Sequence, residues 1–254
     1  MDVPLQCSRS GPGFCLLTAC LLHSFVLFAD PLLPPPFTAH FSGSKYLIFH
    51  LDSLIRLQHI GRYLKYTFNT EGTTLFYSTQ VYDCSVMRIA SQSLLPLEHK
   101  HTDVRNPRFD AYTVFNWKER VAHVKTDYGG KSSDYKIDPS QPVWDPISLQ
   151  IRIMIDAMSG QLSKPRSYKL LEYRKPSTWP TAIQGQETLE TDHGNINTVI
   201  VQRTDGKSFK LWLAKDFGFI PVMVELDSAR VSLTQDPGAI TQDAQLLTEG
   251  QPHC

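Results

Sequence analysis

The sequence lacks most of the patterns by which an enzyme's chemistry is recognised. It has no Gly-x-Ser-x-Gly elbow to present a hydrolase nucleophile. Residues 129–132 (GGKS) lack the spacing of a phosphate-binding loop, and Asp216-Phe217-Gly218 resembles the kinase magnesium triplet without a glycine-rich loop or catalytic loop beside it. We therefore expect a non-enzymatic protein with no cofactor, and a hydrolase is the less favoured alternative.

An excess of charge of either sign is also missing. Lys plus Arg number 25 and Asp plus Glu number 25. Nucleic-acid affinity comes largely from an excess of Lys and Arg that neutralises phosphates, so a nucleic-acid partner is disfavoured.

Cysteine is scarce and unpaired in sequence. The chain has 5 cysteines and no Cys-x-x-Cys pair, which excludes a disulfide framework. Three of them belong to the amino-terminal segment, and the other two are Cys84 and Cys254. Either these two form one bridge, or Cys84 is a buried thiol and Cys254 a free tail thiol, which is the favoured alternative.

A hydrophobic run long enough to span a bilayer is absent. The apolar run of residues 14–29 covers about 16 residues against the ~20 that a spanning helix needs. It predicts a secretory signal peptide cleaved after Ala29, a periplasmic location and a mature chain with no transmembrane segment. Residues 17–20 (LTAC) also resemble a lipobox, so an outer-membrane lipoprotein attached through Cys20 is the alternative.

Four segments follow from these patterns and from composition. Residues 1–29 are the signal peptide, and residues 30–36 are a proline-rich spacer in which missing amide donors disfavour regular structure. Residues 37–234 form a single domain, and residues 235–254 are expected to be a disordered tail.

The domain alternates aromatic or β-branched residues with polar ones in short bursts, as half-buried strands do. In residues 109–117, for example, Ala111, Thr113 and Phe115 share one face while Tyr112 and Asn116 take the other. A sheet with one wet face is most simply antiparallel. The expected strands are residues 37–49, 62–69, 74–82, 95–102, 109–117, 121–126, 168–174 and 181–191.

One segment instead has helical periodicity. Asp145 precedes Pro146, a combination typical of a helix start, and apolar residues then recur at helical spacing from Ile147 to Met158 before Gly160. The apolar surface is wider than one stripe, so the helix should be covered on more than one side. We expect a mainly β (α+β) fold, in which a large curled antiparallel sheet (half-barrel) wraps around this helix.

The carboxyl-terminal part of the domain predicts an antiparallel meander. Residues 199–204 and 208–213 flank Asp205-Gly206, a dipeptide that favours a two-residue type I′ hairpin turn, and residues 220–224 provide the next strand.

Two histidines flank Lys100 in residues 97–101 (LEHKH). On a strand, His99 and His101 share a face, but a zinc site needs three or four ligands, so no metal is expected and both should lie on a solvated face. His193, followed by Gly194, is expected in a turn.

Several short motifs, in this order, resemble those of a known family. They are Phe115-Asn116-Trp117, residues 145–150 (DPISLQ), residues 185–191 (GQETLET), residues 211–216 (LWLAKD) and Pro221-Val222. Over residues 37–233 the chain resembles the bacterial domain-of-unknown-function 3108 family of exported proteins. The resemblance implies a periplasmic protein with a curled sheet around a helix, similar to the half-barrels of lipoprotein and lipid carriers, and it implies no catalytic residues.

A wide curled sheet that one helix does not fill would leave an apolar cavity in which an acyl chain could be buried. We therefore expect binding of a lipid, an acylated molecule or another apolar ligand. The alternative is a structural or adaptor protein of the cell envelope that binds a protein partner. The candidate cavity residues are Phe115, Trp117, Ile151, Ile155, Phe209 and Leu211.

Overall fold

The computed structural model describes residues 32–46, 48–74, 77–90, 93–126, 132–172, 175–227, 229–240 and 252–254. The expected signal peptide and the Cys20 lipidation site lie outside these residues. Of the expected spacer, residues 32–36 are described. They have no regular structure but lie against the fold, where the Pro34 carbonyl oxygen is 2.9 Å from His59 Nε2.

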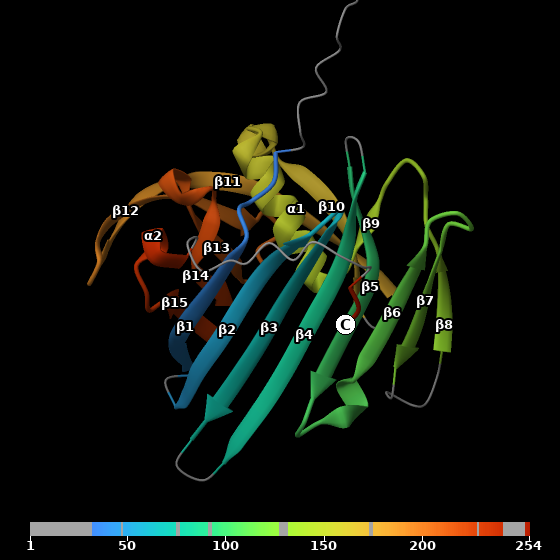
Figure 1. The fold of residues 1–254 in the computed structure, drawn as a ribbon, viewed down its shortest axis with the longest axis horizontal. Coiled ribbons are helices and arrows are strands. Elements are labelled where there is room, and N and C mark those ends of the chain that lie inside the picture. Colours follow the sequence, from blue (N-terminus) through green and yellow to red (C-terminus); the bar gives the residue numbers. More distant parts are fainter. Residues whose placement is uncertain are drawn as a thin grey trace, which may run out of the picture. The chain divides into compact units, whose positions relative to one another are not determined.

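The described residues form one sheet of 15 strands, whose order is β8-β7-β6-β5-β4-β3-β2-β1-β15-β14-β13-β12-β11-β10-β9. Every adjacent pair is antiparallel except β9 and β10, which confirms the predicted antiparallel sheet. The sheet is curled and unclosed, with β8 and β9 at its edges (Figure 1). The strands are β1 (Phe37–Lys45), β2 (Phe49–Ile60), β3 (Tyr63–Thr73), β4 (Ser78–Ala90), β5 (Ser93–Asp103), β6 (Ala111–Asn116), β7 (Val121–Thr126), β8 (Ser132–Lys136), β9 (Val143–Trp144), β10 (Arg166–Glu172), β11 (Lys175–Thr191), β12 (Gly194–Arg203), β13 (Phe209–Ala214), β14 (Ile220–Leu226) and β15 (Ala229–Leu233).

Helix α1 (Pro146–Met158) lies where the periodicity predicts it. The Asp145 side chain accepts hydrogen bonds from the backbone amides of Ile147 and Ser148, so two amides that have no intrahelical partner are satisfied. Pro146 occupies the first turn, where its missing amide costs nothing. Gly160, at φ 70°, follows the helix in the left-handed region that glycine adopts readily.

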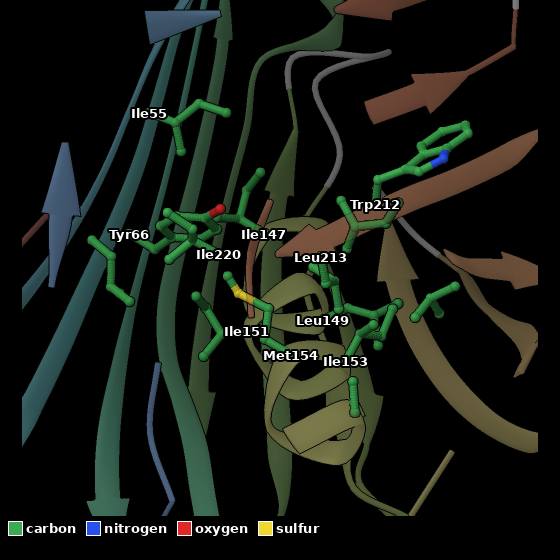
Figure 2. Close-up of a cluster of buried hydrophobic side chains, with 14 of the residues drawn as sticks. Ile55, Tyr66, Ile147, Leu149, Ile151, Ile153, Met154, Trp212, Leu213 and Ile220 are labelled. Carbon is green, nitrogen blue, oxygen red and sulfur yellow. The ribbon is translucent and has the colours of Figure 1, made fainter. Parts of the chain in front are cut away.

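The sheet curls around α1, so the helix is covered on more than one side, as predicted. Figure 2 shows Ile151 and Met154 of α1 near Tyr66 of β3, while Leu149 and Ile153 lie near Leu213 of β13. A second cluster, formed by β6, β7, β9, β10 and the segment after β8, continues the core. It comprises Phe115, Ala122, Val124, Ile137, Val143 and Leu171.

Four strands, β2, β8, β9 and β15, are not predicted from the sequence. In β2, polar Ser53 faces inward and Leu54 faces outward, which interrupts the apolar alternation that marks a strand. Strand β15 is short and pairs with β1. This pairing places the first and last strands of the domain side by side in the middle of the sheet. At this seam, Gly43 is required, because a β-carbon there would collide with the Arg230 carbonyl oxygen.

The β12–β13 connection differs from the predicted two-residue turn. Residues 204–208 lie between the strands, and Gln202 pairs with Lys210. Arg203 donates to the Asp205 carboxylate, and this contact favours the wider loop. Gly206 does adopt a positive φ, 78°, as predicted.

The expected disordered tail contains ordered residues. Pro237–Ile240 form the short helix α2, in which Ile240 is buried. Residues 252–254 lie on the outer face of the sheet, in front of β4 and β5 (Figure 1). There, Cys254 is joined to Cys84 of β4 by a disulfide, so the favoured expectation of two free thiols is wrong. The thiols pair because the tail returns to the sheet, where Lys65 Nζ donates to the His253 carbonyl oxygen at 2.6 Å.

Candidate ligand-binding cavity

A cavity of about 360 Å³ lies between the first turns of α1 and the inner face of the sheet. One wall is apolar and the other is polar. The apolar wall is formed by Leu51, Ile55, Phe68, Ile147, Val224 and Val231. The polar wall is formed by Asp83, His99, His101, Thr113, Gln150 and Glu172.

Strand register assembles the apolar wall from both ends of the domain. Leu51 of β2 lies opposite Gly43 of β1, which lies opposite Val231 of β15, and Val231 lies opposite Val224 of β14. Side chains at directly opposed positions point to the same face of a sheet. The β1–β15 seam therefore makes one continuous wall, and exposed Leu226 extends it to the rim.

Strands β4 and β5 contribute Asp83, His99 and His101 to the polar wall in the same way. Asp83 lies opposite His101, and Ser85 in the next inward-facing position lies opposite His99. His101 Nδ1 is 2.8 Å from Asp83 Oδ1, and His99 Nε2 is 3.5 Å from the same oxygen. The expected solvated face is therefore wrong for this pair. His99 is only 5% exposed, because the curl of the sheet makes this face concave.

The Asp83 carboxylate and the His101 imidazole shift each other's pKa. Burial alone would raise the pKa of Asp83, but the hydrogen bond from His101 and the nearby imidazole of His99 outweigh it and lower that pKa. Burial alone would lower the pKa of His101, but the hydrogen bond to Asp83 and its charge raise it. Desolvation raises the pKa of Glu172, against the opposing effect of both imidazoles.

A buried network holds α1 against the polar wall. Asp145 accepts hydrogen bonds from Ser85 Oγ of β4 at 2.9 Å and from Ser148 Oγ at 2.6 Å. Asp145, Ser85 and Ser148 are all fully buried. The cap of α1 is thus tied directly to the strand that carries Asp83, and this fixes the position of Ile147 and Gln150 in the cavity.

The arrangement does not correspond to a metal site. The part of the chain that the structure describes contains no group of three or more His, Cys, Asp or Glu side chains placed to hold an ion. No helix among the described residues is long and apolar enough to cross a bilayer. His193 lies in the turn between β11 and β12, as predicted.

The six candidate residues chosen from the sequence lie elsewhere in the core. Phe115 and half-buried Trp117 stack on each other in the second cluster. Ile151, Phe209 and Leu211 are buried in the main core, and Ile155 packs against it. None of the six lines the cavity of about 360 Å³.

The candidate residues were chosen because they are aromatic or aliphatic, and such residues fill the core. The polar wall of the cavity was therefore missed. The cavity wall instead includes small polar residues such as Ser53 and Thr70, which hydrogen-bond to each other across β2 and β3. The i, i+2 spacing of His99 and His101 correctly places both imidazoles on one face of β5, but it does not show that this face is the inner one.

These observations define a class of protein: a curled antiparallel sheet around one apolar helix, with a cavity at the helix start. The chain belongs to the family described as "Protein of unknown function (DUF3108)", whose model matches residues 51–232. No curated protein and no solved structure matches the chain.

Proposed function

We propose that the protein binds, without catalysis, a lipid, an acylated molecule or another apolar ligand in the cavity between the curled sheet and α1. One observation carries the proposal: the side chains at the start of α1 and on the inner face of the sheet leave unfilled space between them, and one wall of that space is apolar. Its volume of about 360 Å³ is within the range of roughly 300–1,000 Å³ that is usual for small-molecule pockets.

The hydrophobic effect would supply the affinity. Each methylene transferred from water to an apolar wall contributes about 0.8 kcal/mol. About eight buried methylenes would contribute about 6 kcal/mol, and contacts of the head group add to this while lost ligand freedom opposes it. We therefore expect dissociation constants of tens of micromolar for single-chain ligands.

We further propose that the protein works in the periplasm after export by the signal peptide of residues 1–29, and attachment to the outer membrane through Cys20 is the alternative. The Cys84–Cys254 disulfide supports export, because structural disulfides form and persist in oxidising compartments.

A second candidate function is that of an envelope adaptor. Strand β8 pairs with β7 alone among the described strands and so presents an unpaired backbone edge. Exposed edges of this kind accept a strand from a partner protein. A partner bound there would not depend on the cavity.

Filling the cavity tests the proposal. Val231→Trp places a large side chain in the apolar wall, whereas Val114→Trp makes the same change at an exposed position on the outer face of β6. Binding of a fluorescent apolar probe, such as N-phenyl-1-naphthylamine, and its displacement by acyl ligands are measured for both variants after their folding is checked by circular dichroism.

We expect Val231→Trp to weaken probe binding at least about tenfold and Val114→Trp to leave it unchanged. Equal binding by the wild type and both folded variants would contradict the cavity as the binding site and favour the adaptor function.

A further inference from the structure

The polar wall of the cavity contains two buried polar atoms that have no hydrogen-bond partner in the described part of the chain. They are His99 Nε2 and Gln150 Oε1. His99 approaches Asp83 at 3.5 Å without forming a hydrogen bond, and its side chain is almost fully buried. Buried polar groups without partners are rare and destabilising, so two of them on residues that line one cavity point to a ligand.

The wall around these atoms mainly accepts hydrogen bonds. The Gln150 amide oxygen is an acceptor, and so are the carboxylates of Asp83 and Glu172. Asp83 already accepts from His101. No hydrogen bond or ion pair joins Glu172 to another described side chain, and Glu172 lies at the exposed rim of the cavity. A ligand that donates hydrogen bonds would satisfy this wall.

The charges disfavour an anionic head group. It would face the carboxylates of Asp83 and Glu172 where water is partly excluded and like charges repel more strongly than in bulk solvent. The nearby groups with positive charge are already engaged: His101 with Asp83 at 2.8 Å, and Arg203, whose charge acts on Glu172, with Asp205. No Lys or Arg side chain lines the cavity.

We propose that the ligand is a single-chain amphiphile whose head group donates hydrogen bonds and carries no negative charge, such as a primary amine or a hydroxyl-rich head. This inference rests on the proposed function. The chain lies along Ile55, Val224 and Val231, and the head group donates to Gln150 and Glu172. His99 Nε2 completes the polar contacts.

Three ligands with the same dodecyl chain length test the head group: dodecylamine, 1-monododecanoylglycerol and dodecanoate. Each is titrated below its micelle-forming concentration into the full protein at pH 7.5, and affinity is measured by calorimetry. We expect the amine and the glycerol ester to bind about tenfold more tightly than dodecanoate, which cannot donate to the unpaired acceptors.

Variants identify the atoms involved. Gln150→Leu removes the buried acceptor at nearly constant size, and it should weaken amine and glycerol ester binding about tenfold while leaving dodecanoate unchanged. Glu172→Gln should reduce the difference between the amine and dodecanoate. Glu119→Gln, in the exposed turn after β6, is the matched control and should change none of the affinities.

The outcomes separate the two proposals. Equal binding of all three ligands, or tightest binding of dodecanoate, would overturn the head-group inference while the cavity proposal stands. Failure of all three ligands to bind the wild type would overturn both. The wild-type comparison decides the question even if a variant does not fold.

Discussion

His101 donates a hydrogen bond from Nδ1 to Asp83 Oδ1 across β4 and β5, at 2.8 Å, on the inner face of the sheet. The contact links the protonation of the cavity wall to folding, because the pKa of each partner differs between the folded and unfolded chain.

The first prediction concerns the pH dependence of stability. The pKa of His101 is higher in the folded than in the unfolded chain. Its contribution to the free energy of unfolding is therefore fully present below the unfolded pKa of 6.5 and is lost as pH rises through the folded pKa. The pKa of Asp83 is lower in the folded chain. Its contribution to the free energy of unfolding is therefore present above the unfolded pKa of 3.8 and is lost as pH falls through the folded pKa. The pair therefore stabilises most between about pH 4 and 6.5.

Urea unfolding of the wild type and His101→Gln across pH 4–9 measures this effect. We expect the variant to be less stable by about 1–2 kcal/mol near pH 6 and the difference to shrink towards pH 9. His193→Gln, in an exposed turn, controls for the loss of an imidazole. A His101→Gln difference that grows with rising pH would contradict the assignment.

The second prediction concerns the disulfide. Cys84 and Cys254 are 170 residues apart in sequence, so their bond restricts a large part of the unfolded chain. Cys254→Ser should lower the free energy of unfolding by about 2–4 kcal/mol. Cys84→Ser should have a similar effect, and a reductant should destabilise the wild type but neither variant. A wild-type unfolding midpoint that is insensitive to reductant would show that the bond does not stabilise the fold.

The third prediction separates core residues from cavity residues. Leu211 is fully buried in the main core and does not line the cavity. Leu211→Ala should therefore cost about 2–5 kcal/mol of stability through lost burial and packing. Its ligand affinity, measured well below its melting temperature, should equal that of the wild type. A large loss of affinity in the folded variant would instead place Leu211 in the binding site.

The fourth prediction concerns the β12–β13 loop. Gly206 has φ 78°, which a β-branched residue resists, and a side chain there would meet no steric obstacle. Gly206→Val should thus destabilise the protein by about 1–2 kcal/mol through backbone strain alone. Gly185 also has open space around it but no positive φ, so Gly185→Val is the control. Equal melting temperatures for Gly206→Val and the wild type would rule out the strain.

Helix α1 can be predicted from the sequence alone, whereas the cavity cannot. Asp145-Pro146 and the apolar spacing to Met158 act locally, and α1 lies where they predict it. The antiparallel sheet also follows from local alternation. The β1–β15 seam is different, because it joins residues up to 192 positions apart, such as Phe41 and Leu233, and no local pattern specifies that pairing.

The cavity follows from the same long-range geometry. His99 and His101 lie in a concave wall because the sheet curls, and Gln150 lines the same cavity because the hydrogen bond from Ser85 to Asp145 holds the start of α1 against β4. The apolar residues chosen from the sequence as cavity candidates, such as Phe115, Ile151 and Leu211, instead fill the core. Local patterns thus predict the elements, whereas the unfilled space depends on how the elements meet.

Native mass spectrometry of the protein, isolated gently from its own host and followed by solvent extraction, tests the central claim most directly. The account predicts an adduct of one amphiphile per protein that is lost in Val231→Trp and retained in Val114→Trp. Wild-type protein that carries no adduct, and gains none when it is mixed with dodecyl amphiphiles, would contradict ligand binding in the cavity.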